Sequence, residues 1–432
     1  MFSLLWNNIG SDITRLSLPV TFNEPINILQ RMCEELEYSE LLDRACRLGD
    51  PADRVLNVAV FAISGYSSTL HRCEYKPYNP LLGETYECDR TLDCGFRFVA
   101  EKVVHHPPVC VCYVEGVAGY TYTEWVSINT KFGATSMDLV PNGKTVLYIK
   151  RPNEGRDGEE KDGSESEAKE NDAEQEDCYD GKRNEGKGNK EEEEKKNEVE
   201  SETERERQEG KVIEEDQYEW NKVTTSIYNM FVPGSKIYME HHGNMVVKDN
   251  TTGYQCRVIF HKGSFFSSSR HRVTGTVYDA SGREVRSISG CLTDGIYLRE
   301  SPEVPLWRPN PMPDDYDSYF GLTQFAMELN ELEYGLLDCL PPTDTRLRPD
   351  QRCLEEGKEE EAQVLKEALE ETQREKRKQR EETGEMYTPR WFRRESERRE
   401  SGKERRESER RESGKERRES GKERRESESG EN

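Results

Sequence analysis

Residues 101–109 read EKVVHHPPV, and this stretch is the most informative part of the chain. Two of the seven histidines, His105 and His106, stand side by side and are followed at once by two prolines. A proline restricts the residue before it to extended backbone, and adjacent side chains of an extended segment point to opposite faces. We therefore expect the imidazoles to lie at a bend or edge, where both can donate to one anionic ligand. The alternatives are a structural corner or a metal site with a distant carboxylate, although imidazoles so placed do not easily share one metal ion.

Length and charge set the first bounds. The 432 residues suffice for one large or two ordinary domains, and a net charge of -24 does not suggest nucleic-acid binding. Residues 151–210 hold 24 acidic and 12 basic residues but few apolar ones, so we expect this acidic insert to be disordered. Residues 390–432 repeat RRES six times and form a low-complexity charged tail. The remainder is long enough for a sizeable core.

Nothing in the sequence reads as a signal peptide, and no apolar run approaches the length of a membrane span. The twelve cysteines show no CxxC spacing. Cys110 and Cys112 alternate with Val111, which is typical of a buried strand wall rather than a metal site. We expect reduced thiols and a cytosolic protein.

Hydrophobic periodicity predicts helices at both ends and strands between them. Helical patterns cover residues 2–18, 24–48, 51–70, 318–333 and 355–382. Strands are predicted at 84–89, 95–101, 109–115, 119–128, 144–150, 235–240, 243–248, 254–260, 272–278, 283–289 and 295–299, with a turn at Asn142-Gly143. The series predicts a large antiparallel sheet or barrel, with the acidic insert as an external loop. The helix at 2–18 either packs on the domain or forms a mobile lid over an apolar cavity.

Two further motifs offer charged groups. Residues 76–84, KPYNPLLGE, form a rigid turn because they combine two prolines with a glycine. This turn is either a corner before a strand or a preorganised loop that presents Lys76 and the Asn79 amide to an anion. Three charged residues share one face of the last helix at i, i+4 and i+8, a pattern common on solvated helices: Lys366, Glu370 and Arg374.

Common enzyme motifs are absent from the sequence. It has no Gly-rich phosphate loop with Lys-Ser/Thr, no GxSxG and no HExxH. A second histidine pair, His241-His242, lies in a strand pattern with no nearby nucleophile. We therefore expect a protein that is not an enzyme, and a hydrolase is the least favoured alternative.

Taken in their order, the motifs resemble the lipid-binding domain of the oxysterol-binding-protein-related family. The double histidine is the family's fingerprint, and several segments in the right order make the match specific. The resemblance runs from about Phe2 to Phe392 without the acidic insert, and residues 23–43 look most like a vertebrate subgroup that also carries a pleckstrin-homology domain. The segments that carry it are residues 76–87 (KPYNPLLGETYE), 105–108 (HHPP), 218–222 (YEWNK), 325–330 (FAMELN), 340–344 (LPPTD) and 348–352 (RPDQR).

The resemblance implies a mainly β fold with flanking helices (α+β). Residues 1–389 are expected to form one lipid-binding domain, an incomplete antiparallel barrel around an apolar tunnel. A lid at about 2–18 closes the tunnel, a helical subdomain follows at the C-terminal end, and residues 390–432 form the tail.

The resemblance also implies a lipid carrier that uses no cofactor and no metal. Such a carrier holds a sterol or another lipid, in some members phosphatidylserine, and exchanges it with phosphatidylinositol 4-phosphate between membranes. Its partners are these lipids and the surfaces of membranes, not nucleic acid. We expect a cytosolic monomer that touches the endoplasmic reticulum, the plasma membrane or other membranes at contact sites.

By resemblance, seven residues bind the phosphoinositide headgroup: Lys76, Asn79, His105, His106, Lys366, Glu370 and Arg374. Glu370 is expected to orient the cations or an inositol hydroxyl. Because a phosphate stabilises the proton of a nearby histidine, binding is expected to weaken at alkaline pH.

The chain departs from the family pattern in three places. The usual Gln and Ser before the double histidine are Lys102 and Val104, and Lys102 either adds charge near the mouth or points outward. Residues 289–291, SGC, stand where Gly-Lys-Trp is usual, so packing there is in question. The family's closing aromatic segment is replaced by the repeats after Trp391-Phe392, which is expected to loosen the C-terminal subdomain.

A function of another class also fits the sequence. The chain is then a lipid sensor or scaffold that binds one lipid and signals through its insert and tail without net transport.

Overall fold

The computed structural model describes residues 19–133, 135–151, 215–230, 232, 234–263, 270–332 and 334–392. Contacts divide the chain into a main unit, Met1–Ile149 with Asp216–Asn432, and a second unit, Lys150–Glu215. The predicted lid at 2–18, nearly all of the acidic insert and the tail beyond residue 392 lie outside the described residues. Their predicted roles therefore stay predictions.

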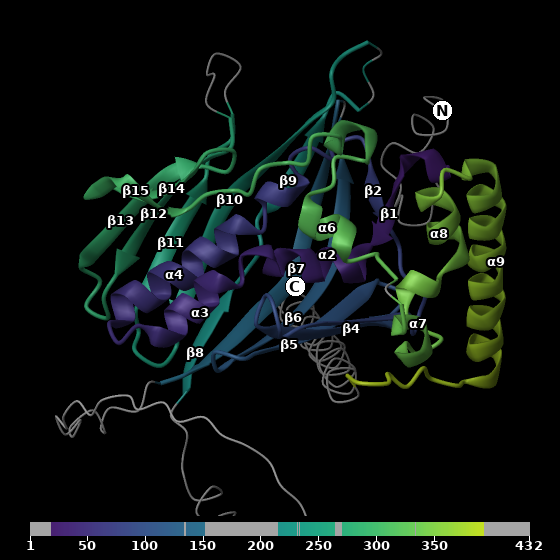
Figure 1. Ribbon diagram of the computed structural model, residues 1–432, viewed down its shortest axis with the longest axis horizontal. Helices are drawn as coiled ribbons and strands as arrows, with labels where there is room; N and C mark the ends of the chain where they lie inside the picture. Colours follow the sequence, from purple (N-terminus) through teal and green to yellow (C-terminus); the bar gives the residue numbers. More distant parts are fainter. Residues whose placement is uncertain are drawn as a thin grey trace, which may run out of the picture. The chain divides into compact units, whose positions relative to one another are not determined.

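One antiparallel sheet of thirteen described strands forms the centre of the main unit (Figure 1). Twelve follow the order β15-β14-β13-β12-β11-β10-β8-β7-β6-β5-β4-β3, and β9 pairs with β10 and β7 beside this path. The strands are β3 (Thr85–Arg90), β4 (Phe96–Val104), β5 (Val109–Gly116), β6 (Tyr120–Phe132), β7 (Ser136–Lys150), β8 (Glu215–Trp220), β9 (Thr224–Tyr228), β10 (Tyr238–Asp249), β11 (Gln255–Phe260), β12 (Arg272–Tyr278), β13 (Glu284–Cys291), β14 (Gly295–Leu298) and β15 (Ser301–Trp307). Since no pairing of the described strands joins β3 to β15, the sheet is an incomplete barrel, and the predicted fold class is confirmed.

Two glycines that were expected at the ends of strands lie inside strands instead. Asn142-Gly143, predicted as a turn, lies inside β7, where Gly143 pairs with Val126. A Cβ at Gly143 would lie 2.2 Å from the carbonyl oxygen of Trp125, so glycine permits a close backbone approach here. Likewise, Gly243 sits within β10 with a φ of +125°, so two predicted strands are one.

The helix predicted at 24–48 is broken into several elements. Residues Asn23–Asn27 form the short strand β1, which pairs in parallel with β2 (Lys76–Tyr78), and the elements α2 (Ile28–Glu34), η3 (Glu35–Tyr38) and α3 (Glu40–Arg47) follow. Asn27 ends the strand because its side chain caps α2, accepting from the backbone N of Leu29 at 2.8 Å.

Helix α4 (Pro51–Ser64) begins as its sequence signal predicts. The Asp50 side chain accepts from the Ala52 backbone N at 2.9 Å, and Pro51 occupies the first turn. The 3-10 turn η4 (Ser67–Thr69) follows it. In Figure 1, α3 and α4 lie against the part of the sheet that contains β10 to β13, and α4 contacts each of these strands.

The C-terminal part is helical, but its elements are short until the last. The helix predicted at 318–333 is only the turn η5 (Tyr316–Ser318) and α6 (Gln324–Glu328). They are followed by α7 (Leu336–Cys339), the turn η6 (Thr345–Leu347), α8 (Pro349–Glu355) and α9 (Glu359–Thr383). Gly357, with a φ of +75°, separates α8 from α9, so the predicted helix 355–382 begins a few residues late.

The N-terminal end of the described chain lies beside α9. The N-terminal 3-10 turn η2 (Val20–Phe22) contacts α9, and the backbone N of Val20 donates to Oε1 of Gln363 at 2.7 Å. Figure 1 shows α9 standing next to α8 at the edge that also carries β1 and β2.

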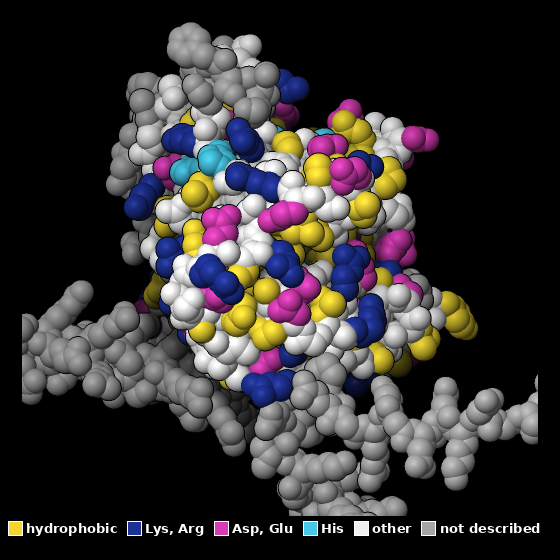
Figure 2. All heavy atoms as spheres, turned by 90° about the vertical axis from the view of Figure 1, so that its left-hand side faces the viewer, with side chains coloured by type: hydrophobic (Ala, Val, Ile, Leu, Met, Phe, Trp, Pro, Cys, Tyr) yellow, Lys and Arg dark blue, Asp and Glu magenta, His cyan; other side chains and the backbone are white. Residues whose placement is uncertain are grey.

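The main core lies between the sheet and helices α2 to α4, and Cys110 and Cys112 are buried in it as predicted. All described cysteines are free thiols. A buried ion pair between Arg54 and Asp216 joins α4 to β8. The face in Figure 2 carries basic and acidic side chains interspersed with hydrophobic ones, so both signs of charge are exposed there.

Candidate functional site

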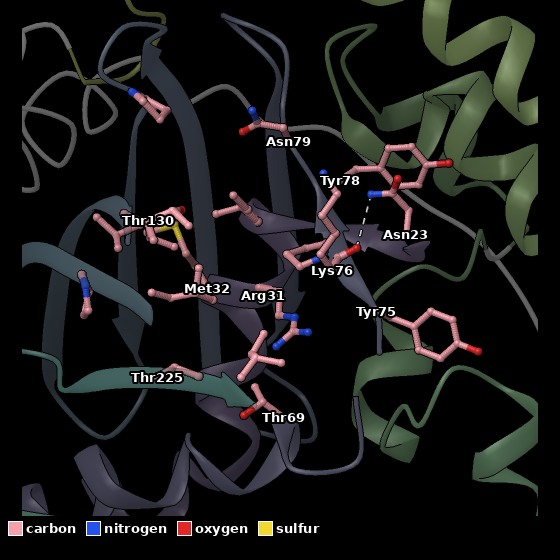
Figure 3. Close-up of a pocket in the computed structure, with 18 of the residues that line it drawn as sticks. Asn23, Arg31, Met32, Thr69, Tyr75, Lys76, Tyr78, Asn79, Thr130 and Thr225 are labelled. Atoms are coloured by element: carbon pink, nitrogen blue, oxygen red, sulfur yellow. Dashed lines mark hydrogen bonds between the residues drawn. The ribbon is translucent and has the colours of Figure 1, made fainter. Parts of the chain in front are cut away.

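A cavity of about 1070 Å³ opens between α2, α4, the sheet and α9. Much of its wall is apolar, and side chains from the helices and from the strands contribute: Met32, Phe61, Ile128, Phe132, Met137, Leu139, Trp220, Ile227 and Met239. In Figure 3, labelled side chains from α2, β2, β6 and β9, among them Met32, Lys76, Thr130 and Thr225, surround this cavity. Ligand pockets usually enclose roughly 300–1,000 Å³, so the space accommodates a large apolar ligand.

All seven residues predicted from the resemblance line this cavity: Lys76, Asn79, His105, His106, Lys366, Glu370 and Arg374. They come from β2 and the loop after it, the turn between β4 and β5, and α9. The fold therefore brings together groups that are almost 300 positions apart in the sequence. We call this region the mouth.

The two histidines do not point to opposite faces, so that expectation is wrong. Strand β4 ends at Val104, and both residues lie in the following turn, where the alternation of a strand no longer applies. Their ring centroids are 4.2 Å apart. Nε2 of His106 accepts from Nη1 of Arg377 at 2.9 Å, because a guanidinium only donates.

His105 is held neutral by its surroundings. Burial first, and then the positive charge of Lys102 and the neighbouring His106, lower the pKa of His105 to about 3. Its Nδ1 is buried and has no hydrogen-bond partner among the described residues. An anion between the two rings would reverse this electrostatic balance and favour a protonated His105.

The lysines of the mouth lie close to one another. Burial, and then the charge of Lys366, lower the pKa of Lys76 to about 8, while Glu370 acts in the opposite direction. Nζ of Lys366 is 2.9 Å from Oε1 of Glu370, and this lysine is almost fully buried. Arg374 lines the cavity, although its guanidinium pairs with Glu371 on the same helix at 2.6 Å.

The Lys76–Glu84 loop is held by hydrogen bonds that involve Glu84 and Arg348. It is therefore both the structural corner and the preorganised loop that its sequence suggested as alternatives. The Glu84 carboxylate accepts from the backbone N of Leu81 at 2.6 Å and from Arg348 at 3.1 Å. Nη1 of Arg348 also donates to the backbone O of Asn79 at 2.9 Å. The loop is thus a structural corner whose outer side carries cavity-lining groups.

Of the two alternatives for Lys102, the structure favours added charge near the mouth, because its charge adds to burial in lowering the pKa of His105. Lys102 neither points outward nor lines the cavity, because its side chain is fully buried behind the Lys76–Glu84 loop. Its Nζ donates to the backbone O of Pro80 at 2.5 Å.

The expected loosening of the C-terminal subdomain is not seen up to residue 392. The buried Glu101 carboxylate accepts from Tyr387 Oη at 2.7 Å and from the backbone N of Arg390 and Trp391 at 2.8 and 3.0 Å. Phe392 packs on Val103, Val109 and Val111. These contacts close the segment onto β4 directly beside the histidine turn.

Two charged residues for which no role was predicted, Glu35 and Lys222, also line the cavity. Lys222 pairs with both Glu35 and Glu124, and Tyr122 donates to Glu124 at 2.6 Å. Burial, and then Glu124, raise the pKa of Glu35 to about 7, with Lys222 opposing them. Two carboxylates thus share one ammonium beside the apolar part of the wall.

The second histidine pair, His241 and His242, forms hydrogen bonds with side chains of neighbouring elements. His241 lines the cavity between Thr69 and Thr225, at 3.0 and 2.9 Å, and burial lowers its pKa to about 3. Nε2 of His242 lies 2.7 Å from Oγ of Ser226, which donates to Asp138. In that chain of contacts the serine stands between the histidine and the carboxylate, so the histidine is not oriented as the base of a nucleophilic triad.

Two features are absent from the described residues. These residues contain no group of three or more His, Cys, Asp or Glu side chains arranged to hold a metal ion. Nor does any described helix combine the length and apolarity needed to cross a membrane.

Comparisons with known proteins agree with the geometry. The model of the family described as Oxysterol-binding protein matches residues 1–419. The chain is 40% identical to mouse oxysterol-binding protein-related protein 3 over 399 residues, which are 92% of this chain and 39% of that protein. It is 38% identical to human oxysterol-binding protein-related protein 7, covering 94% of this chain and 40% of that one. The chain thus spans about two fifths of the length of these relatives.

Two solved structures share the fold. The Osh1 ORD domain in complex with cholesterol has a TM-score of 0.70 at 30% identity, covering 91% of this chain and 82% of that one. The Osh3 ORD in complex with PI(4)P, from Saccharomyces cerevisiae, has a TM-score of 0.69 at 28% identity, covering 91% and 86%.

Proposed function

Because this chain belongs to the oxysterol-binding protein family, we propose that it is a lipid-transfer protein, not an enzyme, that exchanges a sterol or another lipid with phosphatidylinositol 4-phosphate between membranes. The observation that carries the proposal is a single cavity with an apolar wall and a mouth of lysine, arginine and histidine side chains. The ligands named for the Osh1 and Osh3 structures, cholesterol and PI(4)P, support both halves of the exchange.

The apolar wall accounts for extraction from a bilayer. A lipid that leaves the membrane loses roughly 0.8 kcal/mol of burial for each methylene exposed to water, and the cavity replaces that burial. Because both lipids would occupy the same space, the proposal requires that one excludes the other.

The mouth accounts for headgroup recognition. A phosphate monoester carries close to two negative charges near neutral pH, and charge-assisted hydrogen bonds to it are stronger than neutral ones. Lys76 and Lys366 supply ammonium donors from two different elements. His105 and His106 add ring nitrogens from a third, so three separate elements offer donors to one phosphate.

Extraction of phosphatidylinositol 4-phosphate from liposomes tests the site. We expect a His105→Ala/His106→Ala variant to extract at least tenfold less lipid than the unsubstituted chain, since two ligands of a charged group are lost. His261→Ala is the matched control, because His261 bonds Thr274 on the sheet and does not line the cavity. Equal extraction by the double variant and the control would refute the assignment.

A second assay separates transfer from mere binding. Donor liposomes carry a fluorescent sterol, and acceptor liposomes carry phosphatidylinositol 4-phosphate. Exchange predicts that sterol delivery accelerates when the acceptor contains the phosphoinositide. Binding of both lipids without delivery favours the sensor or scaffold hypothesis instead.

A further inference from the structure

Lys102 is built into the back of the Lys76–Glu84 loop through its backbone. Its N donates to the carbonyl oxygen of Glu84 at 3.0 Å, and its carbonyl oxygen accepts from the N of Gly83 at 3.0 Å. The end of the loop therefore continues the ladder between β3 and β4, and the Lys102 side chain projects beneath the residues that precede it.

The ammonium of Lys102 faces two carbonyl groups. Nζ lies 2.5 Å from the backbone O of Pro80 and 3.5 Å from Oδ1 of Asn79. An ammonium has donors but no acceptor, so the amide of Asn79 turns its oxygen toward it. The opposite orientation would set the amide NH2 against the ammonium, donor against donor. The NH2 of Asn79 is consequently directed away from the buried lysine.

Only the side chain of Asn79 is free to rotate. Arg348 fixes its backbone carbonyl at 2.9 Å, whereas the side chain is exposed and lines the cavity. In Figure 3 the Asn79 side chain lies beyond Lys76 and Tyr78, at the rim of the drawn pocket. The contact with Lys102 thus acts on the one part of Asn79 that the backbone leaves free.

We propose that Lys102 is a positioning residue for phosphate recognition, because its buried ammonium holds the Asn79 amide with the NH2 group toward the mouth. The inference rests on the proposed function of the mouth, since the phosphate is the group to which this NH2 donates. Lys102 does not touch the ligand. It acts through Asn79, and a neutral side chain at residue 102 leaves the amide free to turn.

A double-mutant cycle tests this action in the full chain. The variants are Lys102→Met, which keeps an unbranched stem without the charge, Asn79→Ala, and the two combined. Extraction of phosphatidylinositol 4-phosphate is expected to fall roughly fivefold to tenfold in Lys102→Met, because a charge-assisted hydrogen bond is weakened. In the Asn79→Ala background the same change is expected to cost less than about twofold, since its target is gone.

Two controls separate positioning from general damage. Lys102→Gln retains one donor for a carbonyl and is expected to lose less affinity than Lys102→Met. Lys144→Met removes an exposed lysine that pairs with Glu219 on the sheet, and it is expected to extract normally. Sterol loading, which does not need the phosphate donors, is expected to stay within about twofold in Lys102→Met.

Neutron crystal structures of the ligand-free chain and of Lys102→Met provide a readout that needs no lipid, because they distinguish the amide nitrogen of Asn79 from its oxygen. The inference predicts a turned or doubly oriented Asn79 amide in the variant. It is overturned by an unchanged amide, or by equal losses of extraction with and without Asn79. If the unsubstituted chain extracts no phosphatidylinositol 4-phosphate, the proposed function fails, and the crystal structures still decide whether Lys102 orients Asn79.

Discussion

Lys76 is expected to lower the stability of the folded chain, and the Lys76→Met variant tests this. The side chain is enclosed by protein beside Lys366, and its pKa is lowered from 10.5 to about 8. A lowered lysine pKa means that folding disfavours the charged form. The substitution removes the charge but keeps an unbranched chain of similar length, so it should raise the stability of the fold while it reduces headgroup binding.

The size of the effect follows from the pKa difference. Each pKa unit corresponds to about 1.4 kcal/mol, which gives an upper limit of about 3.5 kcal/mol at pH 7. Because the side chain also reaches the solvent of the cavity, roughly 1 to 2 kcal/mol is a better expectation. For a domain of this size each kcal/mol corresponds to roughly 2 °C, so the melting temperature should rise by about 2 to 4 °C.

The sign of the pH dependence is fixed by the same difference. Below pH 8 the lysine is charged in both the folded and the unfolded chain, so the full destabilisation is present. Between pH 8 and about 10.5 the folded chain loses the proton first, and the destabilisation disappears. The melting temperatures of the unsubstituted chain and of Lys76→Met should therefore converge as the pH rises from 7 to 10.

Thermal melting by calorimetry or circular dichroism at pH 7, 8, 9 and 10 provides the measurement. Lys144→Met is the control, since that exposed ion pair with Glu219 is worth less than about 1 kcal/mol. An unchanged or lower melting temperature for Lys76→Met at pH 7 refutes the reasoning. So does a gain in stability that stays constant up to pH 10.

Three further results are expected. Extraction of phosphatidylinositol 4-phosphate should decline above pH 8 as Lys76 loses its proton, and Lys76→Arg should extend extraction to pH 10; a flat profile for the unsubstituted chain contradicts this. Glu35→Gln imitates the protonated acid, so sterol loading of this variant, measured by fluorescence, should not change between pH 6 and 8. A pH profile identical to that of the unsubstituted chain counts against a role for Glu35 beside Lys222. Phe392→Ala should destabilise the C-terminal segment by about 3 kcal/mol and admit proteolysis after Gly384; resistance equal to that of the unsubstituted chain argues that this contact is dispensable.

The strand pattern and the helix caps were readable from the sequence because they depend on near neighbours. The start of α4 is an example, since Asp50 and Pro51 fix it locally. By contrast, the break in the predicted helix at 24–48 depends on the pairing of β1 with β2, 53 positions away at Asn23 and Lys76. The glycine in β7 likewise needed the Trp125 carbonyl of the neighbouring strand to be understood.

Some residues of the site could likewise be predicted from the sequence, and others could not. The seven mouth residues were proposed from ordered motifs and a family resemblance, and the fold brings all of them to one cavity. Arg377, Glu35 and Lys222 were missed, because a charged residue of a polar segment looks solvated until the fold encloses it. Lys102 was recognised as unusual, but its burial beneath Pro80 is a property of the loop's path and not of the residue type.

The contact between Val20 and Gln363 bears on how the chain acquires its structure. It joins positions 343 residues apart, and α9, which completes the mouth, is the last described helix to be synthesised. A contact between such distant positions raises the contact order, and a higher contact order slows folding. During synthesis the apolar wall is therefore in place before α9 can complete the mouth, and a nascent chain with exposed apolar surface is a natural client for chaperones.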